Sequence, residues 1–288
     1  MERNHCKVME SFDYKFDKIY VLKSLGDADT YADDLYRETI EPTCAKFGLA
    51  TEAPIEIYDV SDWDKAIDMI CSDEHKHPLV HIEMHGDEEK GLSLRMGDYV
   101  SWPKVIEDLT RINVESQNNL IVTMAVCYST MNAFSISMVQ KPAPYLFSVT
   151  TKKKVLGRDT YQMFSVFFKE LIETKELYSA LKKVEVDHPE LAKQFDILAV
   201  PFLFENVFKA YAESYKEAEV IKQGYYRALP EVQERELSSE EFELYKETFV
   251  RNYHSAANEY YRKYRDVFFM FDRYPQNRER FNLPERIF

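Results

Sequence analysis

Six short apolar runs between positions 19 and 200, each followed by a longer amphipathic or polar stretch, are the strongest constraint on the fold of this chain. Runs that are apolar throughout are typical of strands buried on both faces of a sheet, and amphipathic stretches are typical of helices that cover it. The sequence therefore predicts an α/β fold in which a mostly parallel central sheet lies between two layers of helices. The runs are residues 19–25, 55–60, 78–85, 119–126, 144–150 and 195–200.

Helix and turn signals lie between these runs. Residues 30–47 have a helical pattern, and a second helix is expected to begin at Ser61, where Asp64 three residues later resembles a capping box. Residues 101–112 predict a third helix. Residues 91–101 alternate between apolar and polar positions around a glycine, which predicts a small hairpin.

The composition changes after residue 200. Residues 201–288 contain long, charged, tyrosine-rich helical patterns and few strand signals. We therefore expect two regions, an α/β domain over residues 1–200 and a helical annex over residues 201–288. The annex is a candidate surface for regulation, for a ligand or for a protein partner.

The charge balance excludes some classes of partner. The chain has 50 Asp and Glu residues against 37 Lys and Arg residues, a formal net charge of −13. A nucleic-acid backbone requires a basic face, so nucleic acid is not expected as the main partner. No apolar run approaches the roughly 18 residues of a membrane span, and the amino terminus lacks the apolar core of a signal peptide. The sequence predicts a cytoplasmic protein.

Four cysteines, Cys6, Cys44, Cys71 and Cys127, are widely spaced with no CxxC pair. This spacing fits reduced thiols better than a disulfide framework or a zinc ribbon. Glycine is scarce, with 7 residues in 288. Each remaining glycine is therefore expected at a joint where the backbone needs an unusual conformation or a close approach.

The histidine-rich segment around residue 81 is a weak candidate for a metal site. In the order His81-Ile82-Glu83-Met84-His85, the glutamate is out of register for the helical H-E-x-x-H motif of zinc peptidases. The segment also predicts a strand, in which His81, Glu83 and His85 share one face but lie about 6.5 Å apart along it. A metal site is not expected, and a metal-dependent hydrolase that uses His81 and His85 is the least favoured alternative.

A histidine and a cysteine at the ends of two apolar runs are a stronger candidate for a functional site. The run at 78–84 ends in His85-Gly86, and the run at 119–126 ends in Cys127. In a parallel sheet both ends lie on the carboxyl edge, where open α/β sheets bind their ligands. An imidazole there can accept the thiol proton of a cysteine, and the resulting thiolate can attack a carbonyl carbon.

These features resemble those of the caspase-like cysteine peptidases, the clan that includes metacaspases, legumain, separase and bacterial CHAT-domain proteases. The resemblance consists of IEMHG followed by IVTMAVCYS, with a sequence separation between histidine and cysteine of 127 − 85 = 42. The Q-A-C-[RQG]-G motif of caspases proper is absent, so the pattern is closest to the bacterial CHAT type. The resemblance covers residues 15–200 and implies a three-layer caspase-like fold that cleaves peptide bonds without a cofactor.

The same resemblance implies roles for individual residues. Cys127 would be the nucleophile, and His85 would be the base and later the acid. The backbone N–H groups of Gly86 and Cys127 would stabilise the oxyanion, and Gly86 would let a substrate carbonyl approach closely. Glu83 could orient His81 or His85. A protein or peptide would be the substrate, and many relatives are regulated effectors in bacterial defence or cell death.

Two further groups are tentative binding residues. Asp27 and Asp29 follow the first strand and could form an acidic pocket for a basic substrate side chain, although Asp29 could equally cap the next helix. A basic cluster near the same sheet edge could bind an anionic activator such as a nucleotide. It consists of Lys152, Lys153, Lys154 and Arg158.

The alternative hypothesis is a non-catalytic caspase-like binding or sensor module. Val126 favours it, because alanine is more usual before the cysteine.

Overall fold

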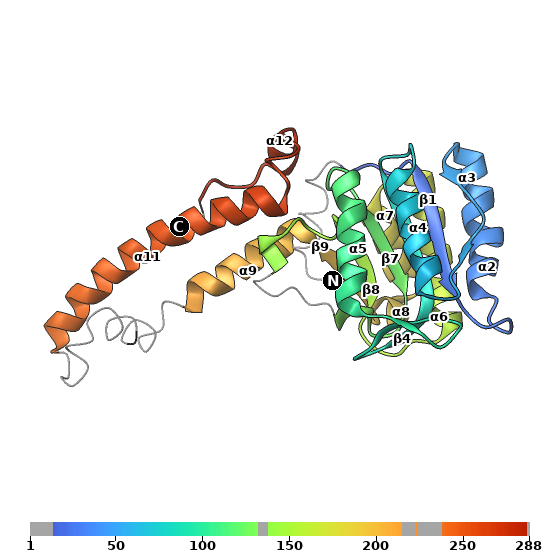
Figure 1. Ribbon diagram of the computed structural model, residues 1–288, viewed down its shortest axis with the longest axis horizontal. Helices are drawn as coiled ribbons and strands as arrows, with labels where there is room; N and C mark the ends of the chain where they lie inside the picture. The colour runs from blue at the N-terminus through green and yellow to red at the C-terminus, as the bar shows by residue number, and fades with distance from the viewer. Residues whose placement is uncertain (1–13, 132–137, 215–222, 224–237, 287–288) are drawn as a thin grey trace. The chain divides into compact units, whose positions relative to one another are not determined.

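The computed structural model describes residues 14–131, 138–214, 223 and 238–286 (Figure 1). The chain divides into two compact units, one spanning Met1–Ala133 and Pro142–Phe202 and the other Phe134–Lys141 and Leu203–Phe288. The boundary after Phe202 lies two residues beyond the position expected from the change in composition. The segment around residue 140 belongs to the second unit, which the composition did not indicate.

A mostly parallel sheet forms the centre of the first unit. The strand order is β2-β1-β4-β7-β8-β9, β3 also pairs with β1, and only β9 runs antiparallel along this path. β5 and β6 form a hairpin that pairs with the end of β4. The strands are β1 Lys18–Ser24, β2 Ala50–Thr51, β3 Ile55–Glu56, β4 Pro78–Asp87, β5 Gly91–Ser93, β6 Tyr99–Val100, β7 Ile121–Ala125, β8 Phe147–Thr151 and β9 Phe195–Ala199.

Helices cover both faces of this sheet. α4 and α5 pack against each other on one face, and the segment from α2 to α3 packs with α6 and α7 on the other (Figure 1). The predicted α/β class with a sheet between two helical layers is therefore confirmed. The elements of this unit are α2 Tyr31–Leu35, the π-helix η1 Tyr36–Ile40, α3 Glu41–Phe47, α4 Val60–Ser72, α5 Trp102–Glu115, the 3₁₀ turn η2 Ser129–Met131, α6 Gly157–Thr174, α7 Leu177–Asp187 and α8 Pro189–Ala192.

Two local predictions differ from the structure. Only Ile55 and Glu56 of the run 55–60 form a strand, because this segment pairs with β1 over two residues. α4 begins at Val60, and its N-cap is Asp59, whose carboxylate accepts the Asp62 N–H at 2.9 Å. The predicted capping box at Ser61 is therefore wrong, and an aspartate two residues earlier performs the same function. The hairpin around Gly97 is confirmed, with φ of 93° at that glycine.

The core of the first unit is apolar on both faces of the sheet. β1, β4, β7 and β8 are buried over nearly their whole length, as expected for central parallel strands. Phe164, Phe167 and Phe168 project from α6 and are fully buried. On the opposite face, the Trp63 indole N–H donates to Asp108 at 2.7 Å and joins α4 to α5.

The second unit is helical in its described part. Phe204, Phe208, Tyr261, Phe268 and Phe269 form a buried aromatic cluster with ring centroids 4.8–5.5 Å apart. No described helix is long and apolar enough to cross a membrane. The elements are η3 Met138–Gln140, α9 Val200–Ser214, α11 Ser239–Phe268 and α12 Asn277–Phe281.

Candidate active site

The register between β4 and β7 brings the predicted histidine and cysteine to one position of the sheet edge. β4 and β7 pair in parallel with Glu83 opposite Ala125, so partners in this register differ in number by 125 − 83 = 42. The numbers of His85 and Cys127 differ by the same amount, 127 − 85 = 42. β7 ends at Ala125, two residues before Cys127, and the equal separation brings both residues to the carboxyl edge of the sheet, where they line one cavity.

Gly86 explains how closely the two strand ends approach. A Cβ atom at this position would overlap the carbonyl oxygen of Cys127 and would lie 2.7 Å from Cγ1 of Val126. Only glycine fits, because any side chain would push the two strand ends apart. The sequence predicted a close approach here but for a different reason: the cysteine's own backbone, and not a substrate carbonyl, occupies the space beside Gly86.

A cavity of about 530 Å³ opens over this pair of strand ends. His85 is exposed and Cys127 is half-buried. The Asp87 carboxylate accepts the backbone N–H groups of Glu89 and Lys90 at 3.0 and 2.9 Å, and these bonds hold the pKa of Asp87 below its usual value. The cavity is lined by His85, Gly86, Asp87, Glu88, Glu89, Lys90, Cys127, Tyr128 and Lys154.

The Cys127 sulfur is held by a segment that follows β8. The Val155 N–H donates to Cys127 Sγ at 3.5 Å, and the thiol donates to the Val155 carbonyl at 3.7 Å. Within the described part of the chain, no hydrogen bond joins His85 to this sulfur. The thiol is therefore hydrogen-bonded to Val155 and not to His85 in this conformation.

Strain at the next residue is a feature that the sequence did not reveal. Tyr128 adopts φ of +62°, and its N–H donates to the Lys153 carbonyl at 3.3 Å. A bulky side chain rarely occupies this left-handed region, and such strain is concentrated at functional sites. The strained turn directs the chain away from β7 immediately after the candidate nucleophile.

This strain has a measurable consequence. Tyr128→Gly is expected to be more stable than Tyr128→Ala by about 0.5–1 kcal/mol, because both remove the ring but only glycine adopts a positive φ without a Cβ clash. Urea unfolding of the two variants measures the difference. At Tyr161, inside α6, the same pair of substitutions should give the opposite order, since alanine stabilises a helix relative to glycine by about 1 kcal/mol. Equal or reversed stability at residue 128 would show that its backbone is not strained.

Hydroxyl groups fasten the turn after Cys127 to the end of β8. The Thr151 N–H donates to Ser129 Oγ at 2.8 Å, and the Thr151 hydroxyl donates to the Val126 carbonyl. The Thr130 hydroxyl donates to the Thr151 carbonyl at 2.9 Å. The segments on either side of the sulfur are therefore held together by polar groups that sequence analysis did not single out.

Beneath the pair lies a buried polar cluster on the same face of β4. His81 Nδ1 lies 2.8 Å from the Thr123 hydroxyl, and His81 Nε2 lies 3.3 Å from Glu83 Oε2. His81 is fully buried against Phe164 and Phe168, and Glu83 is 4% exposed. Glu83 therefore orients His81, one of the two histidines considered for it, and both His81 ring nitrogens have partners.

Comparisons with known proteins do not place the chain in a family. No protein-family model matches the sequence, and no curated protein does. No group of three or more His, Cys, Asp or Glu residues in the described part of the chain could hold a metal ion. The chemistry of the site is therefore argued from its own residues.

The two tentative specificity residues have different surroundings. Asp27 is exposed and forms an ion pair with Arg95, which projects from the segment between β5 and β6. Asp29 is half-buried, and its Oδ1 is buried without a hydrogen-bond partner in the described structure. Neither residue lines the cavity above Cys127.

The basic run is divided between two places. Lys152 forms an ion pair with Asp196 at 3.0 Å and lines a different cavity, beside β9. Lys154 lines the cavity over Cys127. The Lys153 carbonyl holds Tyr128, and Arg158 lies 3.7 Å from Asp159 with its side chain 69% exposed. The four cations therefore do not converge on one point.

The other cysteines differ from Cys127. Cys44 is buried, and this burial raises the pKa of its thiol to about 11. Burial also raises the pKa of the half-buried Cys71 above its usual value. Cys6 lies outside the described residues. Both described thiols stay protonated at neutral pH, so they serve as internal references for the reactivity of Cys127.

Proposed function

We propose that the chain is a caspase-like cysteine endopeptidase that uses Cys127 and His85 as a catalytic dyad. The observation that supports the proposal is that His85 and Cys127 line one cavity at the carboxyl edge and have the same sequence separation as the residues that face each other on β4 and β7. Open α/β sheets bind ligands at this edge. Following the resemblance, we further propose a cytoplasmic effector in bacterial defence or cell death, with residues 201–288 as its regulatory surface.

The reaction follows from the two side chains. His85 takes the thiol proton, and the thiolate attacks the carbonyl carbon of the scissile peptide bond to form a C–S bond. The imidazolium then protonates the leaving amine as the C–N bond breaks. His85 next takes a proton from water, whose hydroxide attacks the thioester. The collapse of this second intermediate releases the acid product, and the proton returns to the thiol.

Backbone groups are available to stabilise the oxyanion. The Cys127 N–H forms no hydrogen bond to the described residues, and it lies beside the sulfur that would attack. The resemblance implies the Gly86 N–H as the second donor, and the Gly86 backbone lies against the carbonyl group of Cys127. Removing one such donor from an enzyme typically slows the reaction by about 10²–10³-fold.

A non-catalytic binding module is the second candidate. It is favoured by the two hydrogen bonds between Val155 and the Cys127 sulfur, which satisfy the thiol without His85. In this alternative the turn at Tyr128 would be a structural joint and the cavity a recognition site. The two candidates make different predictions for thiol reactivity.

Alkylation tests the dyad without a substrate. Limiting iodoacetamide is expected to label Cys127 faster than Cys44 and Cys71 at pH 6, because in the proposed dyad the His85 imidazole accepts the Cys127 proton. Buried Cys44 and half-buried Cys71, whose pKa values are raised, should label appreciably only toward pH 9 and above. Mass spectrometry of the digested protein quantifies each site.

Two variants complete this test. His85→Ala should reduce Cys127 labelling at pH 6 about tenfold while leaving Cys71 unchanged. His77→Ala is the matched control, because His77 is bound to Asp17, near the start of β1 and β4. If Cys127 labels no faster than Cys71 and is unaffected by His85→Ala, the non-catalytic alternative is supported.

A further inference from the structure

A short segment, Lys152–Leu156, connects the candidate thiol to a second cavity. Val155 holds the Cys127 sulfur, and the Lys153 carbonyl holds the strained Tyr128. At the other end, the Lys152 N–H donates to the Gln194 carbonyl at 3.0 Å and the Lys152 ammonium pairs with Asp196. A change at Lys152 can therefore reach Cys127 through a short stretch of backbone to Val155 and the two hydrogen bonds between Val155 and the sulfur.

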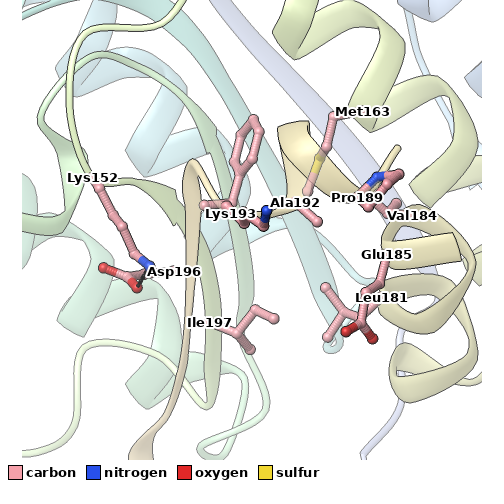
Figure 2. A pocket seen from close by; sticks show the side chains of 11 residues that line it. Lys152, Met163, Leu181, Val184, Glu185, Pro189, Ala192, Lys193, Asp196 and Ile197 are labelled. Carbon is pink, nitrogen blue, oxygen red and sulfur yellow. Dashed lines mark ion pairs between the residues drawn. The ribbon is translucent and has the colours of Figure 1, made fainter. Parts of the chain in front are cut away.

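The second cavity has the size and lining of a small-molecule site. Its volume is about 690 Å³, within the roughly 300–1,000 Å³ typical of such sites. It lies between β9 and the helices α6, α7 and α8 (Figure 2). Apolar side chains form most of its lining, and these are Met163, Leu181, Val184, Pro189, Ala192, Phe195 and Ile197.

One ion pair in the wall can exchange with a ligand. Lys152 and Asp196 both line the cavity and point toward each other (Figure 2). The other two charged lining residues have partners that do not line it: Glu185 pairs with Lys182, and Lys193 pairs with Glu190. A ligand charge can therefore replace one member of the Lys152–Asp196 pair without breaking the ion pairs of Glu185 and Lys193.

The surrounding charge favours an anion. Lys153 and Lys154 directly follow Lys152 and form no ion pair with the described residues. The other charged lining residues, Lys193 and Glu185, each have an ion-pair partner outside the lining. An anionic group would compete with Asp196 for Lys152, the first of three consecutive lysines, and an apolar body would fill the space against Leu181 and Phe195.

We infer that this cavity binds an organic anion with an apolar body, such as a carboxylate or phosphate ester, and that the ligand regulates Cys127. The anion pairs with Lys152 in place of Asp196, and the segment Lys152–Leu156 moves. The hydrogen bonds between Val155 and the Cys127 sulfur then break, and the thiol becomes available to His85. The binding site stands on its own residues, whereas the regulatory consequence rests on the proposed Cys127/His85 dyad.

Binding is tested first, with decanoate as the probe. Calorimetric titration of the full chain, below the micellar concentration, should show binding that is about tenfold weaker for Lys152→Gln, since one charge-assisted contact is lost. Lys169→Gln removes an exposed charge elsewhere on α6 and should leave the affinity unchanged. Decanol and inorganic phosphate, which lack the charge and the apolar body respectively, should each bind more weakly than decanoate. Equal affinity of wild type and Lys152→Gln for decanoate, or no binding, overturns the site.

Regulation is tested by Cys127 labelling. Decanoate should accelerate alkylation of Cys127 at least about threefold in the wild type and not in Lys152→Gln, and Asp196→Asn should reproduce the acceleration without decanoate. Unchanged labelling on binding overturns the regulatory link but leaves the effect of His85→Ala intact. Loss of the His85 effect in every background instead refutes the dyad, while decanoate binding through Lys152 remains.

Discussion

A cell extract incubated with the wild-type chain is expected to accumulate new peptide amino termini that the Cys127→Ala variant does not produce. Removing the nucleophile of a cysteine or serine peptidase costs at least about 10³-fold in rate, because no other group can form the covalent intermediate. Chemical labelling of new amino termini followed by mass spectrometry measures the effect and reports the cleavage sequence.

The Asp196→Asn background makes this experiment independent of an activator. If the Lys152–Leu156 segment restrains Cys127, cleavage should be stronger in Asp196→Asn and should disappear in Asp196→Asn/Cys127→Ala. His85→Ala should lower cleavage by a comparable factor, since the two residues act as a unit. Identical amino termini with and without Cys127, in both backgrounds, would exclude the peptidase and favour a binding module.

Replacing His81 by leucine is expected to destabilise the first unit by about 3–5 kcal/mol at pH 7.5. The substitution keeps an apolar side chain against Phe164 and Phe168 but leaves the Glu83 carboxylate buried without a partner. Removing one member of a buried pair costs more than the pair contributes, because an uncompensated charge remains. Urea unfolding followed by circular dichroism measures the loss.

The double variant identifies the cause. The variant His81→Leu/Glu83→Leu lacks the Glu83 carboxylate as well as its partner. It should therefore recover most of the free energy of unfolding that His81→Leu loses. A double variant as unstable as His81→Leu would attribute the loss to the Thr123 contact or to packing.

Much of the first unit could be predicted because its strands are buried on both faces. The runs that form β1, β4, β7 and β8 are apolar over most of their length. They can therefore be recognised as strands even where the ends of the intervening helices are predicted wrongly. The candidate pair was found for a related reason: a histidine-glycine and a cysteine stand where two such runs end. Each signal lies in consecutive residues, so neighbouring sequence was sufficient to detect it.

Predictions failed where two distant segments decide the outcome. The run 55–60 has strand composition, but only Ile55 and Glu56 find partners on β1. Asp59 and Ser61 are both suitable caps for α4, but the backbone is extended at Asp59 and Ser61 already lies inside the helix. The basic residues are close in sequence and were predicted to form one cluster. In the structure Lys152 pairs with Asp196 of β9, whereas Lys154 lines the cavity over Cys127.

The sequence by itself determined the alternation of buried strands and helices, the position of His85-Gly86 and Cys127 at two strand ends, and the separation of that pair along the chain. Only the tertiary structure decided that β4 and β7 are neighbours in a register that matches this separation, that Gly86 is needed because the Cys127 backbone lies against it, and that Val155 holds the sulfur. The physical reason is that burial and local hydrogen bonding follow from adjacent residues. Register, close backbone approach and ion-pair choice are set by segments that meet only after the sheet has formed.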